Sequence, residues 1–154
     1  IKGFFSMLET QKSDGFELAV KDFMISSERV AHVQKGNNLE HALLVLTRSG
    51  YTAIPVLDHT FKLQGLISTP RIMDVIMGIE RIEFEKLDQI KVEEVMNADL
   101  PCLDENDPLE EALELLIDHP FICVVEGKGT FAGILTRRQV LKQVNRLIKK
   151  IKYN

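Results

Sequence analysis

One long internal repeat limits the folds that this chain can adopt. Three runs of residues recur in the same order, at spacings of 72, 70 and 68 residues. A solenoid needs several units to build a core, so two copies predict instead a pair of similar halves packed against each other. Halves related by a pseudo-twofold axis leave clefts between them, and clefts bind ligands. The recurring pairs are Asp22–Met24 with Glu94–Met96, Asn37–Leu43 with Asp107–Leu113, and Gly65–Ser68 with Gly133–Thr136.

Each copy has the pattern of strand, helix, strand, strand and helix, which predicts an α/β fold with two β-α-β-β-α repeats in pseudo-twofold symmetry. Asn37 and Asp107 each stand three residues before a glutamate, which fits a capping box at the start of the first helix of each copy. Pro108 suits the first helical position, and Gly50 and Pro120 suit the ends of these helices. The expected strands are 30–33, 52–57 and 62–67 in the first copy, and about 100–103, 122–125 and 130–135 in the second.

The pattern divides the chain into four expected segments. They are an N-terminal extension (1–20), a first repeat (21–78), a charged linker (79–91) and a second repeat with a basic C-terminal helix (92–154). A leading helix is expected over 7–24, and Met7, the first methionine, fits a natural start.

Composition excludes several classes of protein. No apolar run approaches the roughly 18 residues of a membrane span, and no signal peptide is visible, so we expect a cytoplasmic protein with no membrane contact. Cys102 and Cys123 lie in apolar, strand-like contexts and are expected to be reduced and buried. The four histidines form no metal-ligand pattern, although His32 lies in a candidate binding segment. No nucleotide-loop, metalloprotease or triad motif is present, so we expect neither catalysis nor a metal nor a cofactor.

Charge is distributed unevenly along the chain. Residues 1–126 carry 11 Lys and Arg against 23 Asp and Glu, whereas residues 127–154 carry eight Lys and Arg and no acid. Cations in the last turns of a terminal helix fit its solvated face and its dipole. Arg137 and Arg138 stand instead at the helix start, where the dipole disfavours cations, so we expect an anion nearby. Nucleic acid is not expected, because the chain is acidic overall and no aromatic residues are interleaved with the basic helix.

A turn from strand into helix ends in Ser68 in the first copy and in Thr136 in the second. Such a turn offers backbone N–H groups, a hydroxyl and the positive end of a helix dipole, all of which suit phosphate. The alternative is that these hydroxyls are only helix N-caps, which the pattern favours more for Ser68 than for Thr136. Arg137 and Arg138 can fork onto phosphate oxygens, which makes the second turn the better anion site.

The chain resembles the tandem cystathionine-β-synthase (CBS) domain pairs. The resemblance covers nearly all of residues 21–148 and rests on the repeated runs above together with Tyr51–Val56. It implies a regulatory module that binds adenine nucleotides or related ligands in clefts between its repeats and forms a homodimer. Many such motifs place an aspartate three residues after the Ser or Thr, where it holds the ribose hydroxyls. Arg71 and Gln139 stand at those positions here, which counts against simple AMP, ADP or ATP binding.

Longer runs are similar to the small stand-alone CBS-pair receptors for cyclic di-AMP in Gram-positive bacteria. Both 3′ hydroxyls of that ligand are esterified, so the missing ribose clamp and the added arginine pair suit it. The runs are Val30–Val33, Gly36–Leu46, Gly50–Asp58, Glu80–Ile90 and Thr136–Arg138. By this resemblance, the ligand-binding residues would be Arg29, Ala31, Tyr51, Thr52, Ala53, Thr136, Arg137 and Arg138.

The resemblance also implies a role for each group of residues. Arg137 and Arg138 would neutralise phosphate, Thr136 would donate its hydroxyl, Tyr51 and Ala31 would shape the adenine slot, and Thr52 and Ala53 would offer hydrogen bonds. The family position that matches Arg29 holds a basic residue. Plain strand packing is the alternative for Tyr51–Ala53, since aromatic and β-branched residues favour strands.

The expected function is therefore that of a non-enzymatic receptor that binds cyclic di-AMP and modulates a partner protein, such as a (p)ppGpp synthetase/hydrolase. Ligand can switch that interaction only if it binds one state better than the other. Two alternatives stay open: a module that senses AMP, ADP or ATP, and an accessory subunit of an enzyme with a vestigial cleft.

Overall fold

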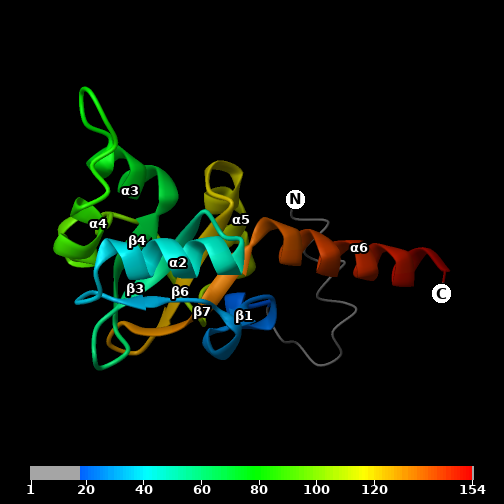
Figure 1. The fold of residues 1–154 in the computed structure, drawn as a ribbon. Coiled ribbons are helices and arrows are strands. Elements are labelled where there is room, and N and C mark those ends of the chain that lie inside the picture. The colour runs from blue at the N-terminus through cyan, green and yellow to red at the C-terminus, as the bar shows by residue number, and fades with distance from the viewer. Residues whose placement is uncertain (1–17, 154) are drawn as a thin grey trace. The chain divides into compact units, whose positions relative to one another are not determined.

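The computed structural model describes residues 18–153 of the 154-residue chain. Both copies have the expected order of elements, β2-α2-β3-β4-α3 and β5-α5-β6-β7-α6 (Figure 1). Most of the leading helix expected over 7–24 lies outside the described residues. The elements are η1 (Val20–Asp22), β1 (Ile25–Ser26), η2 (Ser27–Arg29), β2 (Val33–Gln34), α2 (Leu39–Ser49), β3 (Ala53–Leu57), β4 (Leu63–Ser68), α3 (Thr69–Ile76), α4 (Lys86–Gln89), η3 (Val92–Glu94), β5 (Cys102–Asp104), α5 (Leu109–Asp118), β6 (Phe121–Glu126), β7 (Thr130–Thr136) and α6 (Arg137–Tyr153).

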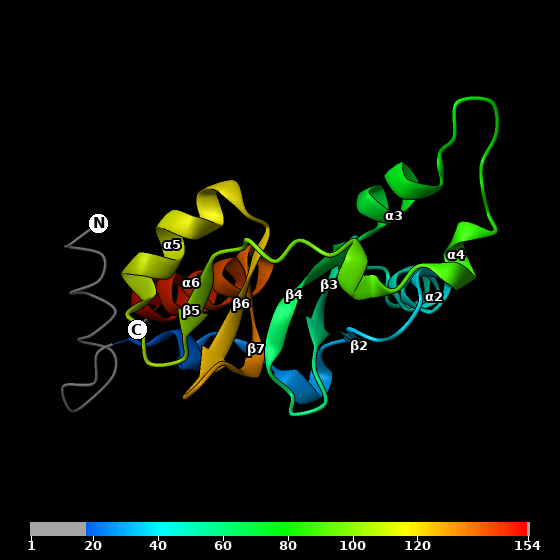
Figure 2. The same cartoon turned by 90° about the vertical axis from the view of Figure 1, so that its left-hand side faces the viewer.

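The chain forms two compact units. The first comprises, among the described residues, 18–28, 101–126 and 132–153, and the second comprises 29–100 and 127–131. In the second unit, β3 pairs with β2 in parallel and with β4 antiparallel, and α2 packs against α3 and α4 (Figure 2). Its core is built from the apolar faces of these elements, including Leu39, Ile54 and Ile67.

The first unit has a four-stranded sheet in the order β1-β7-β6-β5. Strand β1 is antiparallel to β7, and β5 is parallel to β6. Helices α5 and α6 bury apolar side chains, among them Leu109, Leu116 and Val140, in a core that also contains Val20 and Phe23. The apolar residues expected at helical spacing in this copy therefore do face a core.

Each unit is completed by a segment that precedes the other copy in the sequence. We call Asp22–Ser26 and Glu94–Asn97 the leading segments. The first pairs with β7 of the second copy, with Ile25 opposite Ile134, and the second pairs with β4 of the first copy, with Leu66 opposite Asn97. The two repeated copies thus exchange their leading segments, which their recurrence in the sequence did not reveal.

The helix starts differ by one residue from the capping boxes expected at Asn37 and Asp107. Asn38 is the N-cap of α2, where its side chain accepts a hydrogen bond from the His41 N–H, and Pro108 is the N-cap of α5 rather than its first residue. The side chains of Asn37 and Asp107 accept hydrogen bonds from backbone N–H groups three residues earlier, each at 2.8 Å. Asn and Asp side chains compete in this way for nearby turns, which moves the caps by one position.

The expectation that both cysteines are buried is wrong for Cys102, which is exposed at the start of β5. Cys123 is buried, and it lies opposite Cys102 in the parallel pairing of β5 with β6. The short strand β5 begins at the edge of its sheet, so its first side chain is only partly covered. Burial raises the pKa of both thiols above the usual range, most strongly for Cys123.

Candidate functional site

In the second unit, three of the candidate residues form one short stretch at the start of β3. Gly50 ends α2 in the left-handed conformation at φ 77°, which turns the chain into Tyr51–Ala53. Ala53 lies opposite Ser68 in the pairing of β3 with β4, and the Thr69 N–H donates to the Thr52 carbonyl at 2.9 Å. Tyr51 and Thr52 are exposed. The structure therefore brings this stretch together with the Ser68 turn.

Arg29 and Ala31 lie just before β2 in the same unit. Arg29 is exposed at the end of η2, and Ala31 packs against the core of the unit. Because β2 and β3 are parallel, with Val33 opposite Val56, the residues before β2 lie toward the end of the sheet where β3 begins. No hydrogen bond or ion pair joins Arg29 or Ala31 to Tyr51–Ala53 among residues 18–153.

His32 and the Ser68 turn both have structural partners. The His32 ring packs edge-on against Phe61, with 5.4 Å between ring centroids, which supports packing rather than ligation. Ser68 is the N-cap of α3, and its Oγ accepts a hydrogen bond from the Arg71 N–H at 3.4 Å. The Arg71 Nε donates to the Val95 carbonyl at 2.8 Å. Arg71, which stands where the ribose-binding aspartate was expected, therefore binds the leading segment Glu94–Asn97.

In the first unit, Thr136 ends β7 immediately before α6. Its Oγ1 accepts a hydrogen bond from the Gln139 N–H at 3.0 Å, as an N-cap does. A capping hydroxyl still has its own proton to donate, so the cap and a phosphate contact are compatible. The Arg137 N–H donates to the Pro120 carbonyl at 3.1 Å, so the start of the 17-residue helix α6 offers an anion the Arg138 N–H and the positive end of the helix dipole.

Arg137 and Arg138 have different surroundings. The guanidinium of Arg137 donates from Nε to the Leu116 carbonyl and from Nη2 to the Ile117 carbonyl, the latter at 2.8 Å. Both carbonyls belong to the last turn of α5, whose C-terminal end attracts cations. Arg138 is exposed, and its guanidinium makes no hydrogen bond or ion pair within the described part of the chain. Of the two, Arg138 is therefore the one that can meet an anion without breaking a contact.

Sequence reasoning missed why both strand-to-helix turns begin with glycine. A Cβ atom on Gly133 would lie 2.1 Å from the Ile25 carbonyl oxygen, and one on Gly65 would lie 2.7 Å from the Asn97 carbonyl oxygen. Each glycine thus lets a leading segment approach the strand that carries the turn. The shared signal was the recurrence of these glycines together with the leading segments.

Most of the candidate residues in each unit carry polar or charged groups and lie at or next to the ends of strands and helices. Within residues 18–153 no cluster of His, Cys, Asp and Glu could hold a metal ion, and no helix combines the length and apolar character of a membrane span. Among the described candidate residues are two hydroxyls, those of Thr52 and Thr136, the exposed guanidinium groups of Arg29 and Arg138, and the exposed Tyr51. These groups suit recognition of a phosphorylated nucleotide.

Comparison with known proteins shows the family. The model of the CBS domain matches residues 20–78 and 92–146, so the chain belongs to the CBS-domain family as a tandem pair.

Three individual proteins resemble this chain over most of its length. The chain is 54% identical to cyclic di-AMP receptor B of Bacillus subtilis (strain 168) over 145 residues, which cover 94% of this chain and 99% of the relative. It is 59% identical to the CbpB protein of Listeria monocytogenes in a crystal structure with c-di-AMP, at a TM-score of 0.78 and covering 84% of this chain and 97% of the other. A CBS domain-containing protein of Bacillus anthracis is 62% identical, at a TM-score of 0.79 and covering 85% and 96%.

Proposed function

We propose that this chain is a non-catalytic cytoplasmic receptor for cyclic di-AMP. The observation that carries the proposal is the 54% identity, over nearly the whole length of both chains, to a protein named a cyclic di-AMP receptor. The complex of the Listeria relative with the same ligand supports it. The relative is named a receptor and not an enzyme, in agreement with the lack of a catalytic motif in the sequence.

The proposed site uses residues of both repeats, taken as 21–78 and 92–154, with 79–91 as the linker and 1–20 as an extension. Arg138 binds phosphate through its guanidinium and its N–H, and Thr136 donates its hydroxyl. Arg137 reaches phosphate only by giving up its two carbonyl contacts. The first repeat supplies the adenine slot and its hydrogen bonds through Arg29, Ala31, Tyr51, Thr52 and Ala53.

The residue at position 71 favours cyclic di-AMP over AMP, ADP or ATP. Arg71 stands where many relatives have the ribose-binding aspartate, and its side chain is held by the Val95 carbonyl. A guanidinium in the place of the usual acid cannot accept hydrogen bonds from ribose hydroxyls. In cyclic di-AMP both 3′ hydroxyls are esterified, so the loss of that acceptor costs little. The receptor is further proposed to act as a homodimer that changes its contact with a partner enzyme, such as a (p)ppGpp synthetase/hydrolase.

A thermal-shift comparison of the full chain with cyclic di-AMP, cyclic di-GMP, AMP and ATP tests the proposal. A ligand at about 100 times its dissociation constant adds roughly 2.7 kcal/mol of apparent stability. We expect the largest shift with cyclic di-AMP, lost in Arg138→Ala and retained in Arg146→Ala, a matched exposed arginine of the same helix.

Other outcomes have distinct meanings. A larger shift with AMP or ATP would identify an energy sensor. No shift with any of the four nucleotides would favour an accessory subunit whose site is vestigial. An equal loss in Arg138→Ala and Arg146→Ala would mean that general positive charge, rather than the helix start, attracts the ligand.

A further inference from the structure

The two cysteines of the chain lie side by side in the sheet of the first unit. Cys102 is the first residue of β5 and Cys123 belongs to β6, and the two stand opposite each other in the parallel pairing of these strands. Leu103 and Val124, one residue further along each strand, face the core of the unit. Because side chains alternate between the two faces of a sheet, both thiols point to the other face.

The spacing of paired strands brings these thiols within reach of a covalent bond. Neighbouring strands lie about 4.8 Å apart. The Cα atoms of disulfide-bonded residues are roughly 4.4–6.8 Å apart, so an opposite pair such as Cys102 and Cys123 fits. A disulfide also needs its Cβ atoms at about 3.8 Å, so the strands must move slightly closer at this pair. A bond that requires such a shift is strained, and strained disulfides are readily reduced.

The start of β5 can supply that shift. The strand is three residues long and lies at the edge of its sheet. Residues 98–101, which lead into it, belong to no helix or strand. Cys102 can therefore approach Cys123 without disturbing the interior of the sheet.

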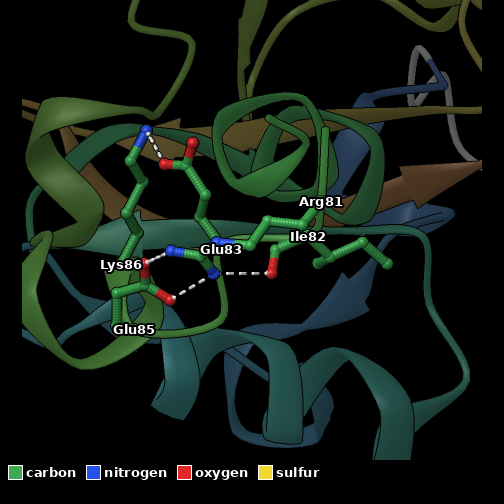
Figure 3. Close-up of polar contacts among 5 residues, drawn as sticks. All are labelled: Arg81, Ile82, Glu83, Glu85 and Lys86. Carbon is green, nitrogen blue, oxygen red and sulfur yellow. Dashed lines mark hydrogen bonds and ion pairs between the residues drawn. The ribbon is translucent and has the colours of Figure 1, made fainter. Parts of the chain in front are cut away.

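The chain before this stretch is engaged in other contacts. Two ion pairs brace the segment that was expected as a charged linker: Arg81 with Glu85, and Lys86 with Glu83 at 2.7 Å (Figure 3). The leading segment Glu94–Asn97 that follows pairs with β4. The movement needed for a disulfide is thus local to the start of β5.

The two thiols differ in exposure, which fixes the order in which they react. Cys102 is exposed, whereas Cys123 is 1% exposed. Burial raises the pKa of both thiols, most strongly that of Cys123. Because the thiolate is the attacking form, an external reagent reacts first with Cys102. Cys123 can then react only with a sulfur that lies beside it.

We propose that Cys102 and Cys123 form a reversible modification site that a small-molecule disulfide oxidises. The Cys102 thiolate attacks one sulfur of the reagent, so that a mixed disulfide forms and one thiol leaves. Cys123 then loses its proton and attacks the Cys102 sulfur, which forms the internal disulfide and releases the second thiol. The protein loses two hydrogen atoms, and the reagent is reduced to two thiols.

Oxidation of this pair would fix the place where the chain enters the first unit. That unit resumes at residue 101, directly before Cys102. A disulfide would tie this entry to β6 in addition to the hydrogen bonds of a three-residue strand. The site is separate from the proposed receptor function and does not depend on cyclic di-AMP.

Treatment of the full chain with oxidised glutathione, followed by intact mass spectrometry without reductant, tests the proposal. We expect the wild type to lose the mass of two hydrogen atoms and to keep no glutathione, and dithiothreitol to restore the original mass. Cys123→Ala should instead keep one glutathione on Cys102, because no second thiol displaces it. Cys102→Ser should stay unmodified, because its remaining thiol is buried.

Cleavage after glutamate, once the remaining thiols are alkylated, locates the bond in the wild type without any substitution. Glu105 and Glu114 lie between the two cysteines, so their peptides stay together only while a disulfide joins them. A wild type that stays reduced, keeps glutathione on Cys102 or forms a disulfide between two molecules would overturn the inference. Glutathione on Cys123 in Cys102→Ser would also contradict it. Cyclic di-AMP binding by the reduced protein is measured separately, so failure of the disulfide leaves the receptor proposal standing.

Discussion

Arg137 and Arg138 are adjacent in the chain, but only one of them is bound to the protein itself. Arg137 joins the start of α6 to the carbonyls at the end of α5, whereas Arg138 is directed to solvent. Loss of the first should therefore affect folding, and loss of the second should affect ligand binding.

We expect Arg137→Ala to lower the free energy of unfolding by about 1–2 kcal/mol without ligand, since charge-assisted hydrogen bonds are lost at a partly exposed site. Arg138→Ala should stay within about 0.5 kcal/mol of the wild type. Urea unfolding of both variants measures the difference. Equal stability of the two variants would show that the contact of Arg137 with α5 contributes nothing.

Asp58 organises the turn between β3 and β4. Its Oδ1 accepts hydrogen bonds from the Thr60 hydroxyl at 2.7 Å, the Thr60 N–H at 2.8 Å and the Lys62 N–H at 3.0 Å. These contacts, above all the Thr60 hydroxyl, lower the pKa of Asp58 to about 2. They also hold Phe61 in the left-handed region at φ 65°, which is costly for an aromatic residue.

A depressed carboxyl pKa stabilises the fold above the pKa of the unfolded chain, near 3.8, and this stabilisation is lost as the pH falls toward 2. We expect Asp58→Asn to melt below the wild type at pH 6 and the gap to narrow between about pH 4 and pH 2. Thermal unfolding across that range is the measurement. A gap that does not change with pH would show that the charge of Asp58 is irrelevant to the turn.

At the scale of elements, the pairing of β1 with β7 depends on Gly133. A methyl group there would lie 2.1 Å from the Ile25 carbonyl oxygen, so the strands must separate. We expect Gly133→Ala to destabilise the protein by roughly 1–3 kcal/mol, as overpacking does. Gly36→Ala is the control, since nothing lies within 4 Å of its added Cβ. Similar unfolding midpoints for the two variants would contradict the close approach.

The sequence predicted the helices and strands more completely than the contacts that they make with one another. Helical spacing and turn residues placed α2, β3, β4, α5 and α6 to within about two residues of their observed bounds. Hydroxyl caps at Ser68 and Thr136 also followed from local pattern. The target of the Arg137 guanidinium did not, because it lies 20 residues away in the chain. The roles of the eight candidate ligand-binding residues remain predictions.

At the scale of the whole molecule, the exchange of leading segments means that the folded units do not coincide with the repeats seen in the sequence. Val92 and Val95 belong to the second copy in sequence but lie buried in the core that contains Leu39. Val20 and Phe23 likewise complete the core around Leu109. Burying such side chains stabilises each core by roughly 1.5–3 kcal/mol per residue.

Two fragments of nearly equal length therefore should behave differently. Residues 29–100 include the leading segment that completes their core, whereas residues 21–91 follow the sequence repeat and lack it. We expect a cooperative thermal transition by circular dichroism for 29–100 and little or none for 21–91. The reverse order would show that the repeat itself, without exchange, is the folding unit.

The same exchange constrains how a duplicated gene of this kind can change over generations. Gly133 lies against the Ile25 backbone carbonyl and Gly65 against the Asn97 backbone carbonyl, so each glycine is needed whatever side chain stands at position 25 or 97. Recombination that replaced one copy with an unrelated domain would remove one partner from each of the two contacts, so both folded units would be affected at once.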